Sequence, residues 1–444
     1  MKILKFGGTS VQSADSIRKS VDCILRYGGD NPVVVLSALA GTTNSLIEAI
    51  NLSLNEISES VEIINQLEFK HLNVLKDLCP QSFNNTSIEI KNIFDDIKRK
   101  LSAIEFLGEI TPFNFASVSS YGEILSTKIF LSYLNEIGID SSLLNIQNYL
   151  ITDSNFKEAK IDFNISLCKF KDNTAHFLKN GIKLTQGFIA SDLKNRTTIL
   201  GRGGSDYTSA VIGNLLKKSG LDIDEIQIWT DVSGILSADP RMIPAAKTIK
   251  SISAKEVRIM SYLGAKVLHP DTIKPALEAD IRVSVRNTFI PDGDYTVIQN
   301  NFTDQFPKLN TIINLREVNE LNFDIPGSSN SWEIANHINN IAFSAGCKPI
   351  SINISEESIT SYYFNSIDVF FDTKYADFIS FQKVFLLAIT GTLVNKKLFE
   401  VINALPENAS IISINNNAIF IKSTFEFSIE NIDLLHNRLI QNFD

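Results

Sequence analysis

Two glycine loops constrain the fold of this chain more than any other feature of its sequence. The first is Lys-Phe-Gly-Gly-Thr-Ser at residues 5–10, and the second is Gly-Arg-Gly-Gly-Ser-Asp-Tyr at residues 201–207. Because glycine has no Cβ, each loop can adopt a positive φ and bring backbone N–H groups close to a phosphate. Neither loop has the Gly-x-x-x-x-Gly-Lys-Ser/Thr pattern of a P-loop, so a nucleotide would need another glycine-based architecture.

The first glycine loop lies between a predicted strand and a predicted helix. Residues 3–6 predict a short buried strand, and apolar residues recur at helical spacing over residues 17–25. A second apolar run at residues 33–36 predicts a central parallel strand, which ends in a turn of small and hydroxyl residues at 37–44. Ligands of α/β proteins bind at such strand ends, so this turn is a candidate binding element.

The rest of the first block alternates between helical and strand patterns. Residues 45–107 predict a helical insert, residues 116–119 a strand, and residues 183–189 a strand with its loop. A further strand at residues 226–229 ends at Thr230 and Asp231. We therefore predict an α/β sandwich with a mostly parallel central sheet.

A polar stretch with two prolines and a glycine divides the chain. We interpret residues 291–310 as a linker between a first domain at residues 1–290 and a second region at residues 311–444. Within the second region, two blocks repeat a similar order of strands and helices, which indicates a weak internal repeat.

Composition argues against several classes of function. The 444-residue chain has 41 basic and 50 acidic residues, and its formal charge of −9 argues against nucleic acid as the main partner. The four cysteines are far apart and form no Cys-x-x-Cys pair, so we expect the reduced cytoplasm. The first residues lead directly into the glycine loop, and no run of about 18 apolar residues follows. We therefore expect neither a secretion signal nor a membrane span.

Several groups near the loops suit phosphoryl transfer, which requires donors to the phosphoryl oxygens, a neutralising cation and an in-line nucleophile. Lys5 and Lys266 are candidate cations, although a lysine at a strand edge or a helix end is more often solvated. A glycine pair can also be an ordinary tight turn. Backbone N–H donors could come from Gly7, Gly8, Gly203 and Gly204.

Other polar side chains suit a small acidic substrate. The planar guanidinium of Arg202 matches a carboxylate, and Asp206 could hold Lys5, assist a metal ion or cap the following helix. Glu123 and Thr43 follow predicted strand ends, where they could bind the amino and carboxylate groups of a substrate. Alternatively, they are a surface carboxylate and a turn hydroxyl, and the residues alone leave both readings open.

Eight motifs occur in order along the first 286 residues, and they begin at Lys5, Ser37, Tyr121, Thr185, Gly201, Trp229, Ala238 and Gly264. On these motifs the chain resembles the aspartate kinases of the amino acid kinase fold. Other kinases with this fold do not combine Lys-Phe-Gly-Gly-Thr-Ser with Gly-Arg-Gly-Gly-Ser-Asp.

The resemblance implies ATP-dependent phosphorylation of the L-aspartate side-chain carboxylate to 4-phospho-L-aspartate, the first step toward lysine, threonine and methionine. Lys5 and Asp206 would organise phosphoryl transfer. The residues around aspartate would be Thr43, Glu123 near the amino group, Phe188, Arg202 on the α-carboxylate, and Ser205. The residues that hold ATP with Mg²⁺ would be Gly7, Gly8, Ser10, Gly203, Gly204, Thr230, Asp231, Leu236, Arg241 and Lys266. Family members commonly have tyrosine where this chain has Leu236, so we expect apolar packing against the base.

The second region resembles a pair of ACT domains, which are small βαββαβ modules that often bind a feedback amino acid. Pro326 and Gly327 before a helix match the turn of the first module, and the second is recognisable from Gly391 onward. The resemblance implies a feedback amino acid, lysine or threonine, and a homodimer formed through these modules.

Two other functions stay open. Another amino acid kinase would act on glutamate, an N-acetylated amino acid or a nucleoside monophosphate, and a non-catalytic sensor would bind an amino acid without turnover. The presence of Lys5, Arg202 and Asp206 argues against a loss of catalysis.

Overall fold

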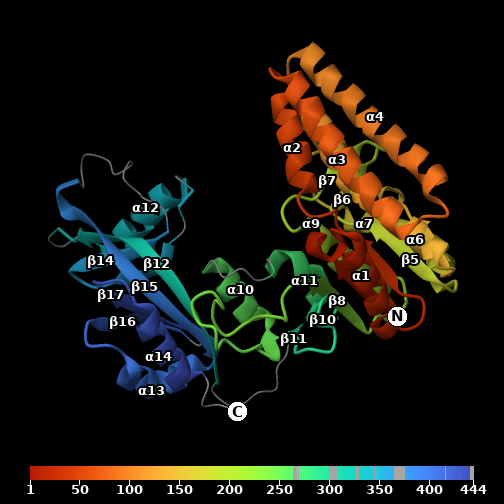
Figure 1. Cartoon of the computed structure of the whole chain (residues 1–444). Helices are drawn as coiled ribbons and strands as arrows, with labels where there is room; N and C mark the ends of the chain where they lie inside the picture. The colour runs from red at the N-terminus through yellow and green to blue at the C-terminus, as the bar shows by residue number, and fades with distance from the viewer. Residues whose placement is uncertain are drawn as a thin grey trace. The chain divides into compact units, whose positions relative to one another are not determined.

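The contacts within the computed structural model divide the chain into two units (Figure 1). The first comprises Met1–Ile235, Lys250–Ala254 and Leu268–Asn300, and the second comprises Leu236–Ile249, Lys255–Val267 and Asn301–Asp444. The structure describes residues 1–263, 268, 270–300, 308–326, 330–344, 346–347, 349–364, 376–415 and 417–440.

A mostly parallel eight-stranded sheet forms the centre of the first unit. In spatial order its strands are β3 (Ser141–Leu144), β5 (Ile182–Gln186), β2 (Val33–Leu36), β1 (Lys2–Phe6), β8 (Glu225–Thr230), β10 (Arg282–Asn287), β11 (Thr296–Gln299) and β9 (Ser251–Ser253). The strands from β3 to β10 are parallel to their neighbours, and β11 is antiparallel to β10. Every residue of β2 and β5 is buried, as expected for parallel strands that are covered on both faces.

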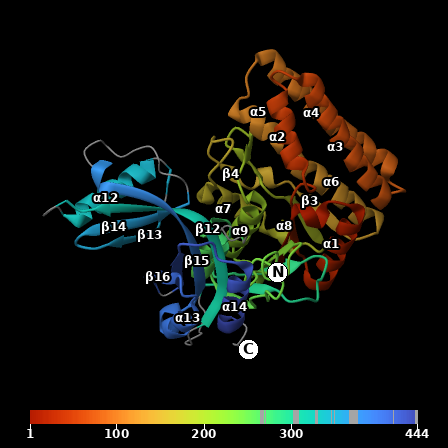
Figure 2. The ribbon, with the colours of Figure 1, turned by 60° about the vertical axis from the view of Figure 1, so that its left-hand side comes forward.

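The helices of the first unit include a long insert. The insert consists of α2 (Thr42–Leu52), α3 (Ile57–Leu78), α4 (Phe83–Leu107) and α5 (Pro112–Ser119). Outside the insert lie α1 (Ala14–Tyr27), α6 (Tyr121–Glu136), α7 (Phe163–Asp172), α8 (Thr174–Leu178), α9 (Gly204–Lys218) and α11 (Pro270–Glu278). Helices α3 and α4 run side by side in both views (Figures 1 and 2). The predicted helical insert is therefore present.

A small second sheet places the end of β5 beside the second glycine loop. It contains β4 (Ile151–Thr152), β6 (Ile189–Asp192) and β7 (Thr197–Ile199) in the order β4-β6-β7. β6 follows β5 after the turn at Gly187 and Phe188, and β7 leads into the loop that begins α9. The Leu200 N–H donates to the Phe188 carbonyl at 2.9 Å, which joins the two segments.

The prediction of a strand at residues 116–119 was wrong, because these residues end helix α5. Thr111 caps the helix by accepting a hydrogen bond from the Asn114 N–H, and Pro112 occupies its first turn. All four residues from 116 to 119 are buried, so they show no helical period and read as a strand. The capping residue Thr111 and Pro112 in the first turn are the local sequence features that indicate a helix here.

A six-stranded antiparallel sheet forms most of the second unit. In spatial order its strands are β13 (Pro349–Ile354), β14 (Ser358–Tyr363), β12 (Lys308–Asp324), β15 (Ile379–Thr392), β17 (Ala418–Ser423) and β16 (Ala409–Ile414). Its helices are α12 (Ser331–Ser344), α13 (Leu398–Ala404) and α14 (Ile429–Leu439). One apolar core lies under α12 and another under α13 and α14, so each half repeats the predicted order of elements.

The structure differs from the sequence-based division at the junction of the units. The segment interpreted as a linker contains β11, which pairs with β10. Helix α10 (Ala254–Tyr262) belongs to the second unit except for its first residue. Ala238 and Ile243 pack in the core with α14, so part of the predicted first domain belongs to the second unit. Within the described residues, the helices are all too short or too polar to cross a membrane.

Candidate active site

The first glycine loop lies at the carboxyl edge of the main sheet. Lys5 is on β1, which pairs with β2 on one side and β8 on the other. Directly after this strand, the Gly7 N–H donates to the Trp229 carbonyl at 3.0 Å, and a 3₁₀ turn at Gly8–Val11 follows. This edge is where ligands of open α/β sheets bind.

The second glycine loop starts helix α9 next to the first loop. Gly203 has a φ of 70°, a left-handed conformation that favours glycine, and it precedes the first helical residue. Asp206 lies in the first turn of α9, where the helix dipole stabilises a carboxylate. Its Oδ1 lies 2.6 Å from Lys5 Nζ, so an ion pair joins the two loops.

A cavity of about 360 Å³ lies between the loops. The residues predicted for catalysis and for aspartate all line it, namely Lys5, Thr43, Glu123, Phe188, Arg202, Ser205 and Asp206. Gly8, Gly203, Gly204 and much of the turn at residues 37–44 complete the wall. The fold thus brings distant segments of the chain to one place, and the roles of the individual residues stay predictions.

Glu123 is a buried carboxylate with an unsatisfied oxygen. The Ala38 N–H donates to its Oε1 at 3.2 Å, whereas Oε2 has no hydrogen-bond partner among the described residues. Burial raises the pKa of Glu123 to about 8, although the Ala38 N–H, its own backbone N–H and the charge of Lys5 favour the ionised form. A cationic ligand group at Oε2 would lower this pKa.

Sequence reasoning missed two contacts that hold the turn after β2. The Lys70 ammonium group, from α3, donates to the Ala40 carbonyl at 2.7 Å. The Ser126 hydroxyl, from α6, donates to the Ser37 carbonyl at 2.7 Å. The partners are 30 and 89 residues apart, so no local pattern reveals these contacts.

Four residues predicted for the nucleotide lie at the same sheet edge but outside the cavity wall. Ser10 is fully buried, and its Oγ lies 2.8 Å from Thr288 Oγ1. Thr230 is the last residue of β8, the strand next to β1, and Asp231 follows it. The Thr230 hydroxyl donates to the Asp231 carboxylate at 3.1 Å. Gly7 is held by its bond to β8. This part of the edge is therefore outside the wall of the 360 Å³ cavity, which is called the acceptor cavity below.

The three other predicted nucleotide residues lie outside the described part of the first unit. Leu236 and Arg241 belong to the second unit, where the Arg241 guanidinium pairs with the Asp239 carboxylate at 2.5 Å. Lys266 lies outside the described residues. Their roles stay predictions.

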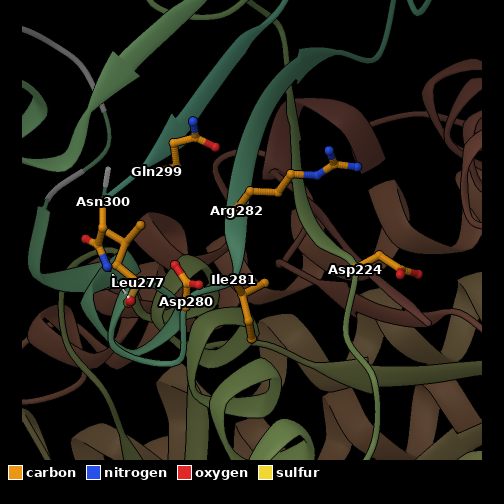
Figure 3. Close-up of a pocket in the computed structure, with 7 residues that line it drawn as sticks. All are labelled: Asp224, Leu277, Asp280, Ile281, Arg282, Gln299 and Asn300. Atoms are coloured by element: carbon orange, nitrogen blue, oxygen red, sulfur yellow. Dashed lines mark hydrogen bonds between the residues drawn. The ribbon is translucent and has the colours of Figure 1, made fainter. Parts of the chain in front are cut away.

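A second cavity, of about 380 Å³, lies at the opposite edge of the same sheet (Figure 3). Asp224 precedes β8, Ile281 precedes β10 and Arg282 is the first residue of β10, so the cavity is at the amino ends of these strands. Asp224 is already paired with the N-terminal ammonium group at 2.9 Å. The glycine loops lie at the carboxyl edge, so we assign the chemistry to the first cavity.

Residues 1–287 of this chain match the amino acid kinase family. Lysine-sensitive aspartokinase 3 of Escherichia coli (strain K12) is 36% identical over 304 residues, which span 67% of this chain and 64% of that protein. Chloroplastic aspartokinase 1 of Arabidopsis thaliana is 32% identical over 304 residues, which span 67% of this chain and 51% of that protein. These matches thus leave a third or more of each relative unaligned.

Similarity to solved structures extends over the whole chain. A crystal structure of E. coli aspartokinase III in complex with lysine and aspartate (T-state) has a TM-score of 0.81 at 27% identity and covers 100% of both chains. The complex of that enzyme with aspartate and ADP (R-state) has a TM-score of 0.77 at 27% identity and covers 99% of both chains. These findings confirm the resemblance inferred from the motifs and the predicted fold class.

Proposed function

We propose that this chain, which belongs to the amino acid kinase family, transfers the γ-phosphoryl group of ATP to the side-chain carboxylate of L-aspartate. One observation carries the proposal. The Lys5–Asp206 ion pair, Arg202 and the unsatisfied carboxylate of Glu123 meet in a single cavity between two glycine loops. Further support comes from the relatives named aspartokinases and from the similar crystal structure of E. coli aspartokinase III, which contains aspartate and ADP.

The cavity wall offers complementary groups for an amino acid with an acidic side chain. Arg202 would bind the α-carboxylate through its planar guanidinium. Glu123 Oε2, which lacks a partner among the described residues, would accept a hydrogen bond from the α-ammonium group. Thr43 and Ser205 would add hydroxyl contacts, and Phe188 an apolar one. The substrate side chain would then be oriented toward Lys5.

The acceptor needs no general base. The side chain of aspartate has an unperturbed pKa of about 3.9 and is ionised at neutral pH. Catalysis therefore consists of aligning two anionic groups and offsetting their repulsion. Lys5, held 2.6 Å from Asp206, would neutralise the phosphoryl group. The backbone N–H groups of the two glycine loops would share the remaining charge.

ATP would lie along the carboxyl edge of the sheet, with its terminal phosphate at the acceptor cavity. We propose Thr230, Asp231, Leu236, Arg241 and Lys266 as further residues for the nucleotide. The carboxylates at positions 206 and 231 are hard oxygen donors of the kind that Mg²⁺ prefers, and phosphate and water would supply most of its ligands. The ion would neutralise phosphate charge.

For the second unit we propose a feedback amino acid site. Lysine is the first candidate, because the similar structure of aspartokinase III contains lysine, and threonine is the alternative. Inhibition of aspartate-dependent ADP formation by millimolar lysine or threonine would identify the effector. A homodimer formed through the second unit and a cytoplasmic location stay predictions.

A coupled assay of ADP release tests the proposed activity. We expect aspartate to support ADP formation and glutamate, N-acetylglutamate and uridine monophosphate to support little or none. Preference for one of the other acceptors would assign the chain to another kinase of this family. Calorimetric binding of aspartate without any turnover would favour a non-catalytic sensor.

A further inference from the structure

The backbone at Phe188 is strained where it lines the acceptor cavity. Phe188 has a φ of 65°, which is uncommon for a residue with a bulky side chain. The Ile189 N–H donates to the Gly187 carbonyl at 2.7 Å, across Phe188. A bond from residue i+2 to residue i around a central residue with positive φ defines the rare, strained form of the γ-turn. Such strain persists only where the surrounding structure holds it.

The start of helix α9 packs tightly against this turn. A Cβ at Gly187 would lie 2.5 Å from Ser205 Cβ, and a Cβ at Gly204 would lie 2.7 Å from Phe188 Cδ2. Both positions therefore require glycine. The ring of Phe188 and the neighbouring Ser205, which line the cavity together, are positioned by this close contact.

The polar link between the turn and the helix is the Thr208 hydroxyl. Thr208 is fully buried on α9, one turn after Gly204, and it is not part of the cavity wall. Its Oγ1 accepts a hydrogen bond from the Phe188 N–H at 3.1 Å and donates one to the Gly204 carbonyl at 2.7 Å. One hydroxyl thus accepts a hydrogen bond from an N–H of the strained turn and fixes the turn to the second glycine loop.

We propose that Thr208 is a positioning residue for the acceptor substrate, acting through the γ-turn that presents Phe188 to the cavity. The inference rests on the proposed function, because it takes aspartate as the acceptor. Without the hydroxyl, the Phe188 N–H loses its hydrogen-bond acceptor, and the turn can relax toward a negative φ. The ring would then move away from the cavity wall. Binding of the acceptor should weaken, while the ATP site should be little changed.

The test compares Thr208→Val, which removes the hydroxyl at similar size, with Thr208→Ser, which keeps it. We expect Thr208→Val to raise the KM for aspartate about tenfold and to change the KM for ATP less than about twofold. Thr208→Ser should restore the KM for aspartate to near the wild-type value. Thr152→Val is a matched control, because Thr152 is also buried and its Oγ1 lies 2.8 Å from Thr198 Oγ1, away from the cavity wall. It should leave both KM values unchanged.

Amide hydrogen exchange gives a readout that does not depend on activity. The Phe188 N–H should exchange at least about tenfold faster in Thr208→Val than in the wild-type protein or in Thr208→Ser. If Thr208→Val does not fold, Thr208→Ala removes the same hydroxyl without placing a methyl group against the Phe188 N–H.

The outcomes separate the two proposals. An unchanged KM for aspartate in an active, folded Thr208→Val protein would overturn the inference, as would equal losses for both substrates. A wild-type protein without aspartate-dependent ADP formation would instead refute the proposed function. The exchange rate of the Phe188 N–H would then still decide whether Thr208 holds the turn.

Discussion

Each unit of this protein contains a partly buried ion pair between a lysine and a carboxylate, and the surroundings of the two pairs differ. In the first unit, Lys5 Nζ lies 2.6 Å from Asp206 beside an open cavity. In the second, Lys422 Nζ lies 2.6 Å from Glu320, a carboxylate that also accepts hydrogen bonds from Tyr362 and Gln382. The two ion pairs therefore have the same distance between nitrogen and oxygen but different surroundings.

The comparison teaches how to distinguish a functional pair from a structural one. Both oxygens of Glu320 are satisfied within the sheet of β12, β14, β15 and β17. At the first pair, the neighbouring Glu123 keeps an oxygen without a partner among the described residues, and glycines of both loops line the adjacent cavity. Buried polar groups are normally satisfied, so an unfilled one beside a cavity marks a place for a ligand.

Loss of Lys5, the lysine of the ion pair in the first unit, should have the largest effect on catalysis. We expect Lys5→Ala to lower turnover by roughly 10²-fold or more, because it removes a preorganised positive charge from the transferred phosphoryl group. Steady-state kinetics of the variant, with its fold checked by circular dichroism, measures the effect. Turnover near the wild-type value in a folded variant would contradict the assigned role.

The same substitution in the second unit should act on stability instead. Lys422→Ala leaves the Glu320 carboxylate, which is 2% exposed, without its cation. We expect the free energy of unfolding to fall by about 3 kcal/mol, measured by urea denaturation, while turnover of the folded protein stays within about twofold. A loss of turnover comparable to that of Lys5→Ala would remove the distinction between the two pairs.

A smaller and more selective effect is expected at the substrate carboxylate. Arg202→Ala should raise the KM for aspartate about tenfold, with a smaller change in the KM for ATP. The reason is that the Arg202 guanidinium is proposed to bind the α-carboxylate of aspartate. Initial rates with each substrate varied in turn provide the measurement. Equal increases in the two KM values would contradict this role and indicate that Arg202 contacts the phosphates of ATP.

The pH dependence of aspartate binding should be the smallest of these effects. Because burial raises the pKa of Glu123 to about 8, the side chain must lose its proton to pair with an ammonium group. The charged groups near it are Lys5 and, beyond it, Asp206. The KM for aspartate should fall roughly fivefold between pH 7 and pH 8, because the ionised fraction of a group with a pKa of about 8 rises from about one tenth to one half over this range. In Glu123→Gln this change should disappear.

The stability of the unliganded protein gives an independent check on Glu123. Its folded-state pKa of about 8 lies above the ordinary value of 4.5, so between these pH values the folded state keeps a proton that the unfolded state has released. The contribution of this group is therefore complete below about pH 4.5 and is lost as the pH rises toward 8. Glu123→Gln should show a flatter stability profile across this range. An unchanged profile would place the pKa of Glu123 near its ordinary value.

Local patterns predicted those parts of the protein whose structure depends on local sequence. The glycine loops, the parallel strands and the helical insert carry their own signals. The meeting of Lys5, Asp206 and Arg202 was expected from the resemblance to aspartate kinases. The two blocks of the second region were also found from the order of their elements. Helix α5 was missed because complete burial hides the helical period.

Tertiary contacts could not be read from the same patterns. The bond from Lys70 to Ala40 and the burial of Ile243 in the core of the second unit both depend on partners far away in the sequence. Thr208 had only a weak signal, as a hydroxyl residue one helical turn after Gly204. Its second partner, Phe188, is 20 residues earlier in the chain.

The most direct test of the account is a crystal structure of the protein with aspartate and ADP bound. We expect the α-carboxylate of aspartate within hydrogen-bond distance of Arg202, its ammonium group on Glu123, and its side-chain carboxylate facing Lys5 and the nucleotide. Aspartate bound at the opposite edge of the sheet, near Asp224 and Arg282, or ADP bound away from both glycine loops, would contradict the account.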